Sequence, residues 1–317
     1  MPERRVRAVI VNHNGAAITA GCLASLAAQS YAPLDVLVVD DCSTPAEWTL
    51  LQQLKPRHVV ALRQSKPRGY AASLNLGMRS TELPPAAFML AMNNDISLPD
   101  TETVRKLADA LQENPRRVAA SPLVCHVGVV LQPETAIQVR RVPDFKTVLV
   151  AHSCWLRRLP RFRGLCKRYT YDDCRPYQLG LRLDCETING ALFLVWTSFL
   201  ESIGFLDENT FLYMEEQILG AQIKRSNHTA CLVTSTYVDH LQGTSTGLRS
   251  GAFRPLMWLH QVRSELWYLR AYLASGPMHR GFFLLVRAVD FVAKLGLQVW
   301  QDIRGKVHAI AGTGDMR

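Results

Sequence analysis

Short apolar runs alternate with helix-like segments through the first half of the chain, and this alternation constrains the fold more than any other feature. The apolar runs are VRAVIV, LDVLVV, HVVAL and AAFMLAM, and the segments between them are AAITAGCLASLAAQSY, PAEWTLLQQL and YAASLNLGMRS. A continuous apolar run indicates a strand buried on both faces of a parallel sheet. Strands that alternate with helices form βαβ units. The sequence therefore predicts an α/β fold built on a parallel sheet.

Polar residues follow three of these four runs. They are NHNG after the first run, DDCS after the second and NNDI after the fourth. Ligands bind beyond the carboxyl ends of the strands in such sheets, so we expect the three groups to share one cleft. The carboxylate of Asp95 is a candidate ligand for a divalent cation, because hard cations prefer oxygen and often bridge protein to phosphate. The same Asn-Asn-Asp sequence is also typical of turns and helix caps.

The alternation of strands and helices continues as far as the sequence TYVDH, with one interruption. We expect helices over TETVRKLADALQEN, SFLESIGF and FLYMEEQILGAQIKRSN, and strands over VAASPLVCH, TINGALFLVW and ACLVTSTYVDH. Residues 140–182 show no regular period and are basic and aromatic. We expect them to form an irregular insertion or a mobile loop.

The net charge of +9 is unevenly distributed. Residues 140–182 hold eleven Lys and Arg against three acidic residues, residues 247–317 hold ten against four, and the remainder is acidic. Two basic segments are therefore attached to an acidic core. A basic surface can bind nucleic acid, anionic lipid or phosphorylated substrates, and it can also be an ordinary solvated face. Because the sequence contains no nucleic-acid-binding motif, we do not expect a nucleic-acid partner.

The C-terminal region has a helical, apolar pattern interrupted at regular intervals. Its polar positions Arg287, Asp290, Lys294, Gln298 and Gln301 step by three or four residues and form one narrow stripe. We expect a helix that buries most of its circumference. It either packs against MWLHQVRSELWYLRAYL, pairs with a second subunit, or lies in the plane of a membrane as an anchor.

The N-terminus and the cysteines indicate a cytoplasmic protein. MPERRVRAVIVNHNG lacks the apolar region and cleavage site of a secretory signal, and the eight cysteines form no paired pattern. No segment has the roughly 20 uninterrupted apolar residues of a membrane span. We expect a cytoplasmic location, with peripheral association at the inner face of the cytoplasmic membrane as an option.

The motifs, taken in order, resemble those of the nucleotide-sugar glycosyltransferases of family 2. The matching segments are VIVNHNG, VVDDCST, RGYAASLNLG, the DXD-like MNNDI, NGALFLV, FLYMEEQILGAQIKR and VDH, over about residues 6–243. The closest similarity is to bacterial rhamnosyltransferase-like enzymes of surface polysaccharide synthesis. The resemblance implies a GT-A (Rossmann-like nucleotide-diphospho-sugar transferase) fold over residues 1–246 and a C-terminal helical extension over 247–317.

The resemblance also implies a reaction. A UDP- or dTDP-sugar would donate its sugar, with inversion, to a hydroxyl of a glycan or of a polyprenyl-diphosphate-linked acceptor. The basic insertion over 140–182 would face that acceptor. A non-catalytic nucleotide-binding module of the same fold is the alternative.

Five residues are implied to bind the nucleotide part of the donor. Asp41 would recognise the nucleobase, with Asn12, His13 and Asn14 in the same pocket, and Arg68 would contact phosphate. From the residues alone, an aspartate after the second strand can equally cap the next helix, and Arg68 can simply solvate a loop.

The metal site is implied at the fourth strand tip. Asp95 would bind Mn²⁺ or Mg²⁺ across the diphosphate, and Asn93 and Asn94 would contact the donor beside it. His240 would complete the metal site, with Asp239 orienting its ring or replacing it as a ligand.

The general base is implied at Glu215-Glu216, where the family has Glu-Asp. Glu216 falls on the aspartate position and would take the proton from the acceptor hydroxyl. The change from aspartate to glutamate leaves the choice between Glu215 and Glu216 open. Either glutamate could also simply complement the positive end of a helix dipole.

Overall fold

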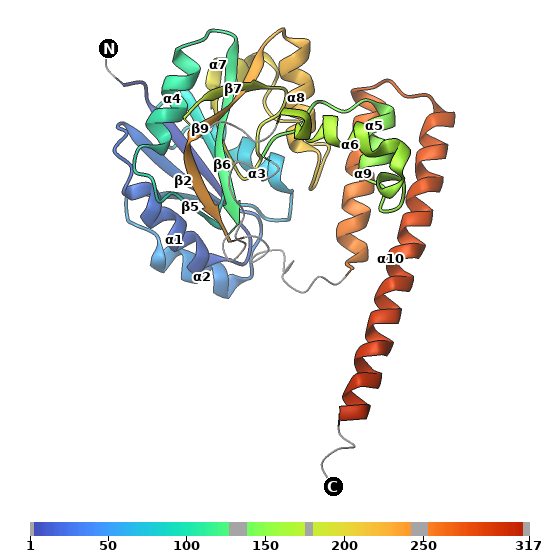
Figure 1. The fold of residues 1–317 in the computed structure, drawn as a ribbon. Helices are drawn as coiled ribbons and strands as arrows, with labels where there is room; N and C mark the ends of the chain where they lie inside the picture. The colour runs from blue at the N-terminus through green and yellow to red at the C-terminus, as the bar shows by residue number, and fades with distance from the viewer. Residues whose placement is uncertain (1–2, 127–137, 175–179, 242–252, 313–317) are drawn as a thin grey trace.

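The computed structural model describes residues 3–126, 138–174, 180–241 and 253–312 (Figure 1). Within these ranges a single mixed sheet has the strand order β3-β2-β1-β4-β8-β6-β9-β5, and β7 pairs with β9. Helices cover both faces of the sheet, and two long helices lie to one side of it (Figure 1). The architecture is the predicted α/β fold with a C-terminal helical extension.

The first four long strands form the predicted parallel half of the sheet. β1 pairs in parallel with β2 and β4, and β2 pairs in parallel with β3. These strands form because their apolar residues are buried on both faces. Their bounds are β1 (Val6–Asn12), β2 (Leu34–Asp40), β3 (Val60–Arg63) and β4 (Phe88–Asn93), and the helices between them are α1 (Ala16–Ala27), α2 (Pro45–Leu54) and α3 (Tyr70–Met78).

The second half of the sheet mixes strand directions. β8 runs antiparallel to β4 and β6, whereas β9 runs parallel to β6 and antiparallel to the short strands β5 and β7. The strands are β5 (Ile96–Ser97), β6 (Arg117–His126), β7 (Arg182–Cys185), β8 (Leu192–Trp196) and β9 (Thr229–His240). The helices of this half are α4 (Thr103–Gln112), α7 (Thr197–Ser202) and α8 (Glu215–Arg225).

Two apolar cores lie on opposite faces of the sheet. One contains side chains of α1, α2 and α4, and the other contains side chains of α3, α7 and α8. This three-layer arrangement places the carboxyl ends of β1, β2 and β4 along one edge, as the polar strand ends predict.

Helix α8 is shorter than the sequence pattern predicts. The apolar segment FLYM was expected to belong to the helix, but α8 begins at Glu215. Tyr213 and Met214 have φ angles of 73° and 72°, in the left-handed region that side chains other than glycine rarely adopt. This reversal of the backbone stops the helix from extending further toward the N-terminus.

The expectation that residues 140–182 are irregular is wrong. The segment contains α5 (Phe145–Ala151), α6 (Arg163–Tyr169) and three short 3₁₀ helices at Leu156–Arg158 (η1), Pro160–Phe162 (η2) and Asp172–Cys174 (η3). The Asp144 side chain accepts a hydrogen bond from Thr147 N and so caps α5. The helices are stabilised by packing against distant parts of the chain, which a local sequence pattern does not show.

A third apolar core joins this insertion to the C-terminal helices α9 (Pro255–Ala271) and α10 (Pro277–Gly312). It contains Val148 of α5, Ile218 of α8, Leu269 of α9 and Phe283 of α10. The core therefore unites residues on both sides of the predicted domain boundary at residue 246. That boundary remains a prediction.

Helix α10 is oriented opposite to the expectation from its sequence. It packs beside α9 through its polar stripe, so that Arg287 and Asp290 are buried, while many of its large apolar side chains are exposed. The prediction that α10 buries most of its circumference is wrong, because a buried ionic network fixes which side faces α9. No helix among the described residues is long and apolar enough to cross a membrane.

Candidate active site

Asn12 and Asn94 tie together the strand ends at which the sequence predicts a bound ligand. Asn12 is fully buried and donates from Nδ2 to Asp40 Oδ1 over 2.7 Å, while its own Oδ1 accepts from Thr19 Oγ1 over 2.8 Å. Asn94, also buried, donates to the same Asn12 oxygen and to Thr19 Oγ1 over 3.3 and 3.1 Å. Both amides thus hold the ends of β1 and β4 against α1.

His13 and Asn14 are exposed beside these strand ends. His13 Nδ1 lies 2.8 Å from Asp41 O, and Asn14 Oδ1 accepts from Thr44 N over 2.9 Å. Asn14 has a φ of 51°, a conformation that asparagine tolerates better than most residues. The two side chains therefore bridge the ends of β1 and β2 and stand where a ligand can reach them.

Asp41 organises the loop that leads into α3. Its carboxylate accepts from Arg68 N over 2.7 Å, from Gly69 N over 3.0 Å and from Gln64 Nε2 over 3.0 Å. The helix after β2 is capped by Thr44, so neither aspartate at this strand end caps it. Asp40 is fully buried and accepts from Ser43 N over 3.1 Å.

The loop at Arg68 and Gly69 packs closely on the segment before α8. Gly69 has a φ of 87° and leaves no room for a side chain against the backbone of Phe211, and Tyr70 N donates to Phe211 O over 3.1 Å. The Arg68 side chain is half exposed and lies 3.5 Å from Glu208. The loop thus links the end of β2 to the start of α8.

Asp95 and His240 meet as the sequence predicts. Asp95 Oδ1 lies 3.2 Å from His240 Nε2, and both side chains are largely buried. The antiparallel pairing of Ile96 with His240 between β5 and β9 sets this position. Carboxylate oxygen and imidazole nitrogen together suit Mn²⁺, and oxygen suits Mg²⁺. No cluster of three or more potential ligands occurs among the described residues, so a cation here would need further oxygens from a bound ligand.

Glu216 lies against the loop before β8. A Cβ atom added to Gly190 would lie 2.5 Å from Glu216 Oε1, so a larger residue at that position would force the Glu216 side chain to move. The Gly190 carbonyl accepts a hydrogen bond of 3.0 Å from the Tyr70 hydroxyl. The Tyr70 hydroxyl therefore ties α3 to the loop against which Glu216 packs.

Tyr70 interacts electrostatically with Glu215, with Glu216 and with Asp95 at the end of β4. Burial first, and then the charges of Glu215, Glu216 and Asp95, raise the pKa of Tyr70 well above its usual value. The hydroxyl is therefore a neutral hydrogen-bond donor among carboxylates. No sequence signal singled out Tyr70, because an aromatic residue at the start of a helix is ordinarily part of the core.

Glu215 and Glu216 differ in their surroundings. Glu215 Oε1 is out of contact with solvent and accepts no hydrogen bond from a described residue. Burial first, and the charge of Glu216 second, raise the pKa of Glu215 to about 8. Glu215 therefore holds a proton at neutral pH, because two adjacent carboxylates in such a site do not both ionise readily. The strained residues Tyr213 and Met214 place both glutamates in the first turn of α8.

The family model for glycosyl transferase family 2 matches residues 8–176, which is more than half of the chain. The chain belongs to glycosyl transferase family 2. The match spans β1 to β6, including the strand ends and Asp95. A search of curated proteins returned no match.

Solved structures of GT-A glycosyltransferases share this fold at low sequence identity. GalNAc-T7 with UDP, GalNAc and Mn²⁺ superposes with a TM-score of 0.60 and 14% identity, covering 85% of this chain and 48% of its own. The mannosyltransferase PcManGT from Pyrobaculum calidifontis with GDP-Man and Mn²⁺ superposes with a TM-score of 0.53 and 15% identity, and the match covers 97% of this chain and 81% of PcManGT. Residues 1–349 of S. aureus TarS superpose with a TM-score of 0.51 and 12% identity, and the match covers 91% of this chain and 72% of that structure. This family 2 chain thus has the GT-A fold and spans about half the length of GalNAc-T7.

Proposed function

We propose that the chain transfers a sugar from a nucleotide-sugar donor to an acceptor hydroxyl, with inversion at the anomeric carbon. The observation that carries this proposal is the grouping of the Asp95–His240 pair and the Glu215–Glu216 pair around Tyr70. A cation site for a diphosphate and a carboxylate base are the two parts that this reaction requires.

The nucleoside diphosphate would bind across the ends of β1, β2 and β4. Similar folds hold UDP in GalNAc-T7 and GDP-Man in PcManGT, each with Mn²⁺, which supports a donor of this chemical class. The exposed side chains of His13 and Asn14 are available to the nucleotide. Asp41 would meet the nucleobase with its remaining lone pairs while it holds the loop at Arg68 in place. Asn12 and Asn94 would act by holding the ends of β1 and β4 against α1.

Asp95 and His240 would hold Mn²⁺ or Mg²⁺ together with diphosphate oxygens. The donor set fits, because a buried carboxylate oxygen and an imidazole nitrogen already lie 3.2 Å apart. When bound, the cation supplies positive charge for the departing nucleoside diphosphate. Asn93 stands at the same strand end, where its side chain can contact the donor.

Glu216 would act as the general base. The acceptor oxygen attacks the anomeric carbon, its proton passes to the Glu216 carboxylate, and the bond from that carbon to the diphosphate oxygen breaks. Burial and the charge of Glu216 raise the pKa of Glu215 to about 8, so Glu215 tends to hold its own proton, which supports assigning the base to its neighbour. The position of Glu216 against Gly190 supports this assignment.

The acceptor would be a glycan or a polyprenyl-diphosphate-linked glycan in bacterial surface polysaccharide synthesis. The cations of residues 140–182 support an anionic acceptor of this kind, which a cytoplasmic enzyme would meet at the inner face of the membrane. The transferred unit would be a hexosyl or rhamnosyl group.

A non-catalytic nucleotide-binding module is the second candidate. Two observations favour it. Arg68 pairs with Glu208, so its charge is partly neutralised before a phosphate could bind it. Glu215-Glu216 also stands where the family has Glu-Asp. This candidate retains nucleotide binding but predicts no turnover.

Release of nucleoside diphosphate separates the two candidates. We would supply UDP-, dTDP- and GDP-sugars with Mn²⁺, Mg²⁺ or EDTA, in the presence of a bacterial membrane-lipid extract. Release from one donor that EDTA abolishes and that Asp95→Ala lacks supports the transferase. Tight nucleotide binding without release from any donor would contradict it and support the binding module.

A further inference from the structure

The outer face of α10 is apolar along most of its length. Between residues 277 and 301 the charged residues are Arg280, Arg287, Asp290 and Lys294, and all fall within a sector of about 80° when each residue advances the helix by about 100°. The opposite side is exposed and carries large apolar side chains. They include Met278, Phe282, Leu285, Val289, Val292, Val299, Trp300 and Ile303, of which Val292 is 69% and Leu285 is 62% exposed.

This face cannot turn inward, because α10 is held by a buried ionic network on its other side. Arg287 Nε lies 3.2 Å from Glu265 of α9, and Arg287 Nη1 lies 3.1 Å from Asp290. Asp290 accepts from Ser153 Oγ over 3.0 Å and from Cys154 N over 2.9 Å. Rotating the helix would leave these buried charges unpaired, which is costly. A contiguous apolar surface of this kind marks an interaction site.

A cluster of exposed cations lies beside α10. We define it as the η1–α6 basic cluster, and its members are Arg157, Arg158, Arg161, Arg163, Lys167 and Arg168. None of them forms an ion pair with another residue in the part of the chain that the structure describes. Leu156 at the start of this segment packs in the same core as Phe283 of α10. Trp155, directly before it, is 38% exposed.

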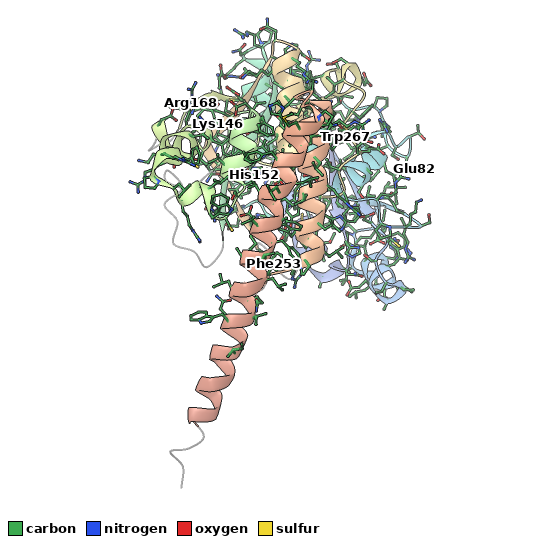
Figure 2. The ribbon with its side chains drawn as sticks, turned by 90° about the vertical axis from the view of Figure 1, so that its right-hand side faces the viewer. Glu82, Lys146, His152, Arg168, Phe253 and Trp267 are labelled. Atoms are coloured by element: carbon green, nitrogen blue, oxygen red, sulfur yellow. The ribbon has the colours of Figure 1, made fainter. Side chains whose placement is uncertain are left out.

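The η1–α6 basic cluster and helix α10 lie side by side. Figure 2 shows α10 in front of the rest of the chain, with the insertion that carries Lys146 and Arg168 beside its upper part. The lower part of α10 extends past the other elements (Figure 2).

Charge complementarity selects an anionic bilayer as the occupant. In a symmetric dimer through this face, each copy would present the same patch to the other and bring the two basic clusters toward each other. Anionic lipid headgroups instead neutralise arginine and lysine, and the acyl region accepts the apolar side chains. An exposed tryptophan at the boundary is typical of such an interface.

We propose that α10 lies along an anionic bilayer, with its outer apolar face in the boundary between headgroups and acyl chains and the η1–α6 basic cluster on lipid phosphates. The inference goes beyond the proposed reaction and does not depend on it. It rests on the orientation of α10 and on the exposed cations of the η1–α6 basic cluster, so it can be tested separately from transferase activity.

Flotation of the full chain with lipid vesicles tests the proposal. We expect binding to vesicles of phosphatidylglycerol mixed with phosphatidylcholine, and much weaker binding to phosphatidylcholine alone. Leu285→Glu with Val292→Glu should reduce binding by at least about tenfold, since charge is costly in the apolar boundary. Leu54→Glu is the matched control, because Leu54 is 43% exposed on α2, and it should bind like the wild type.

The cations are tested with Arg157→Ser, Arg158→Ser and Arg161→Ser. Each should weaken binding to the anionic vesicles about fivefold and leave binding to neutral vesicles unchanged. Light scattering would measure the mass of the protein in solution without lipid. A dimer that Leu285→Glu with Val292→Glu converts to a monomer, or vesicle binding that these variants do not reduce, would overturn the proposal. Circular dichroism would establish that the variants are folded.

Discussion

Glu216 occupies space that a side chain on residue 190 would need, since a Cβ at Gly190 would lie 2.5 Å from Glu216 Oε1. Gly190 also accepts the hydrogen bond of Tyr70. The loop before β8 therefore determines where the Glu216 carboxylate can stand, although it contributes no reactive group of its own.

Gly190→Ala should reduce kcat while leaving nucleotide binding intact. The added methyl group displaces the carboxylate, and a shift of about 1 Å can lower turnover about 100-fold. The measurement is steady-state release of nucleoside diphosphate. Gly21→Ala in α1 is the control, because nothing lies within 4 Å of an added Cβ there. Normal kcat in Gly190→Ala would show that the Glu216 position is not critical.

Glu216→Gln and Glu215→Gln should have different effects. The first removes the proposed base and should lower turnover about 100-fold or more without weakening donor binding. The second replaces a group that is already protonated at neutral pH, so it should retain most activity. Turnover at the wild-type rate in Glu216→Gln, with loss in Glu215→Gln, would assign the base to Glu215.

The raised pKa of Glu215 makes the stability of the fold depend on pH. Its pKa rises from 4.5 to about 8 on folding, so the folded state binds the proton more tightly than the unfolded state. The resulting stabilisation is complete below the lower value and is lost as pH rises through the higher one, by at most about 1.4 kcal/mol per pH unit. Urea unfolding across this window should show a steeper decline for the wild type than for Glu215→Gln. Parallel curves would contradict the assignment.

Asp95→Ala and His240→Ala should each remove the dependence of nucleotide binding on Mn²⁺. Affinity measured by calorimetry with Mn²⁺ should fall at least about tenfold, toward the value measured with EDTA. Asp35→Ala provides a control, since Asp35 lies at the other end of β2 and pairs with Arg5. Unchanged Mn²⁺ dependence in both site variants would place the cation elsewhere.

Arg287→Ala should strongly destabilise the helical extension. It leaves Glu265 and Asp290 buried without their cation, which costs about 3–5 kcal/mol. Urea unfolding measures the change, and Arg163→Ala, which removes an exposed arginine, should have little effect. A small loss in Arg287→Ala would mean that the ionic network does not hold α10 in its orientation.

The sequence was sufficient to predict the sheet and several contacts of the candidate site. Ile10 and Leu90 sit in continuous apolar runs, and such runs have few alternatives to a buried strand. The resemblance to the family assigned Asp95 and His240 to one site, and in the structure the two side chains lie 3.2 Å apart. Their role in metal binding remains a prediction.

Other features depend on contacts between distant segments. Helix α5 is stabilised by α9 and α10, which lie more than 100 residues further along the chain, so its local pattern was insufficient. The left-handed pair Tyr213–Met214 breaks an apolar segment that reads as helix. The polar stripe of α10 looked like the outer face of a helix, but Glu265 and Ser153 supply partners that make it the inner face.

Helix α8 belongs to two cores at once, with Leu219 in the sheet core and Ile218 in the core shared with α9 and α10. The first turn of α8, which carries Glu216, is therefore connected to α10 through the packed side chains of their shared core. If α10 rests on a bilayer, the reactive carboxylate stands at a fixed height above the lipid surface. The protein would then favour acceptors whose reactive hydroxyl projects from the lipid anchor by the same distance as Glu216 stands above the lipid surface.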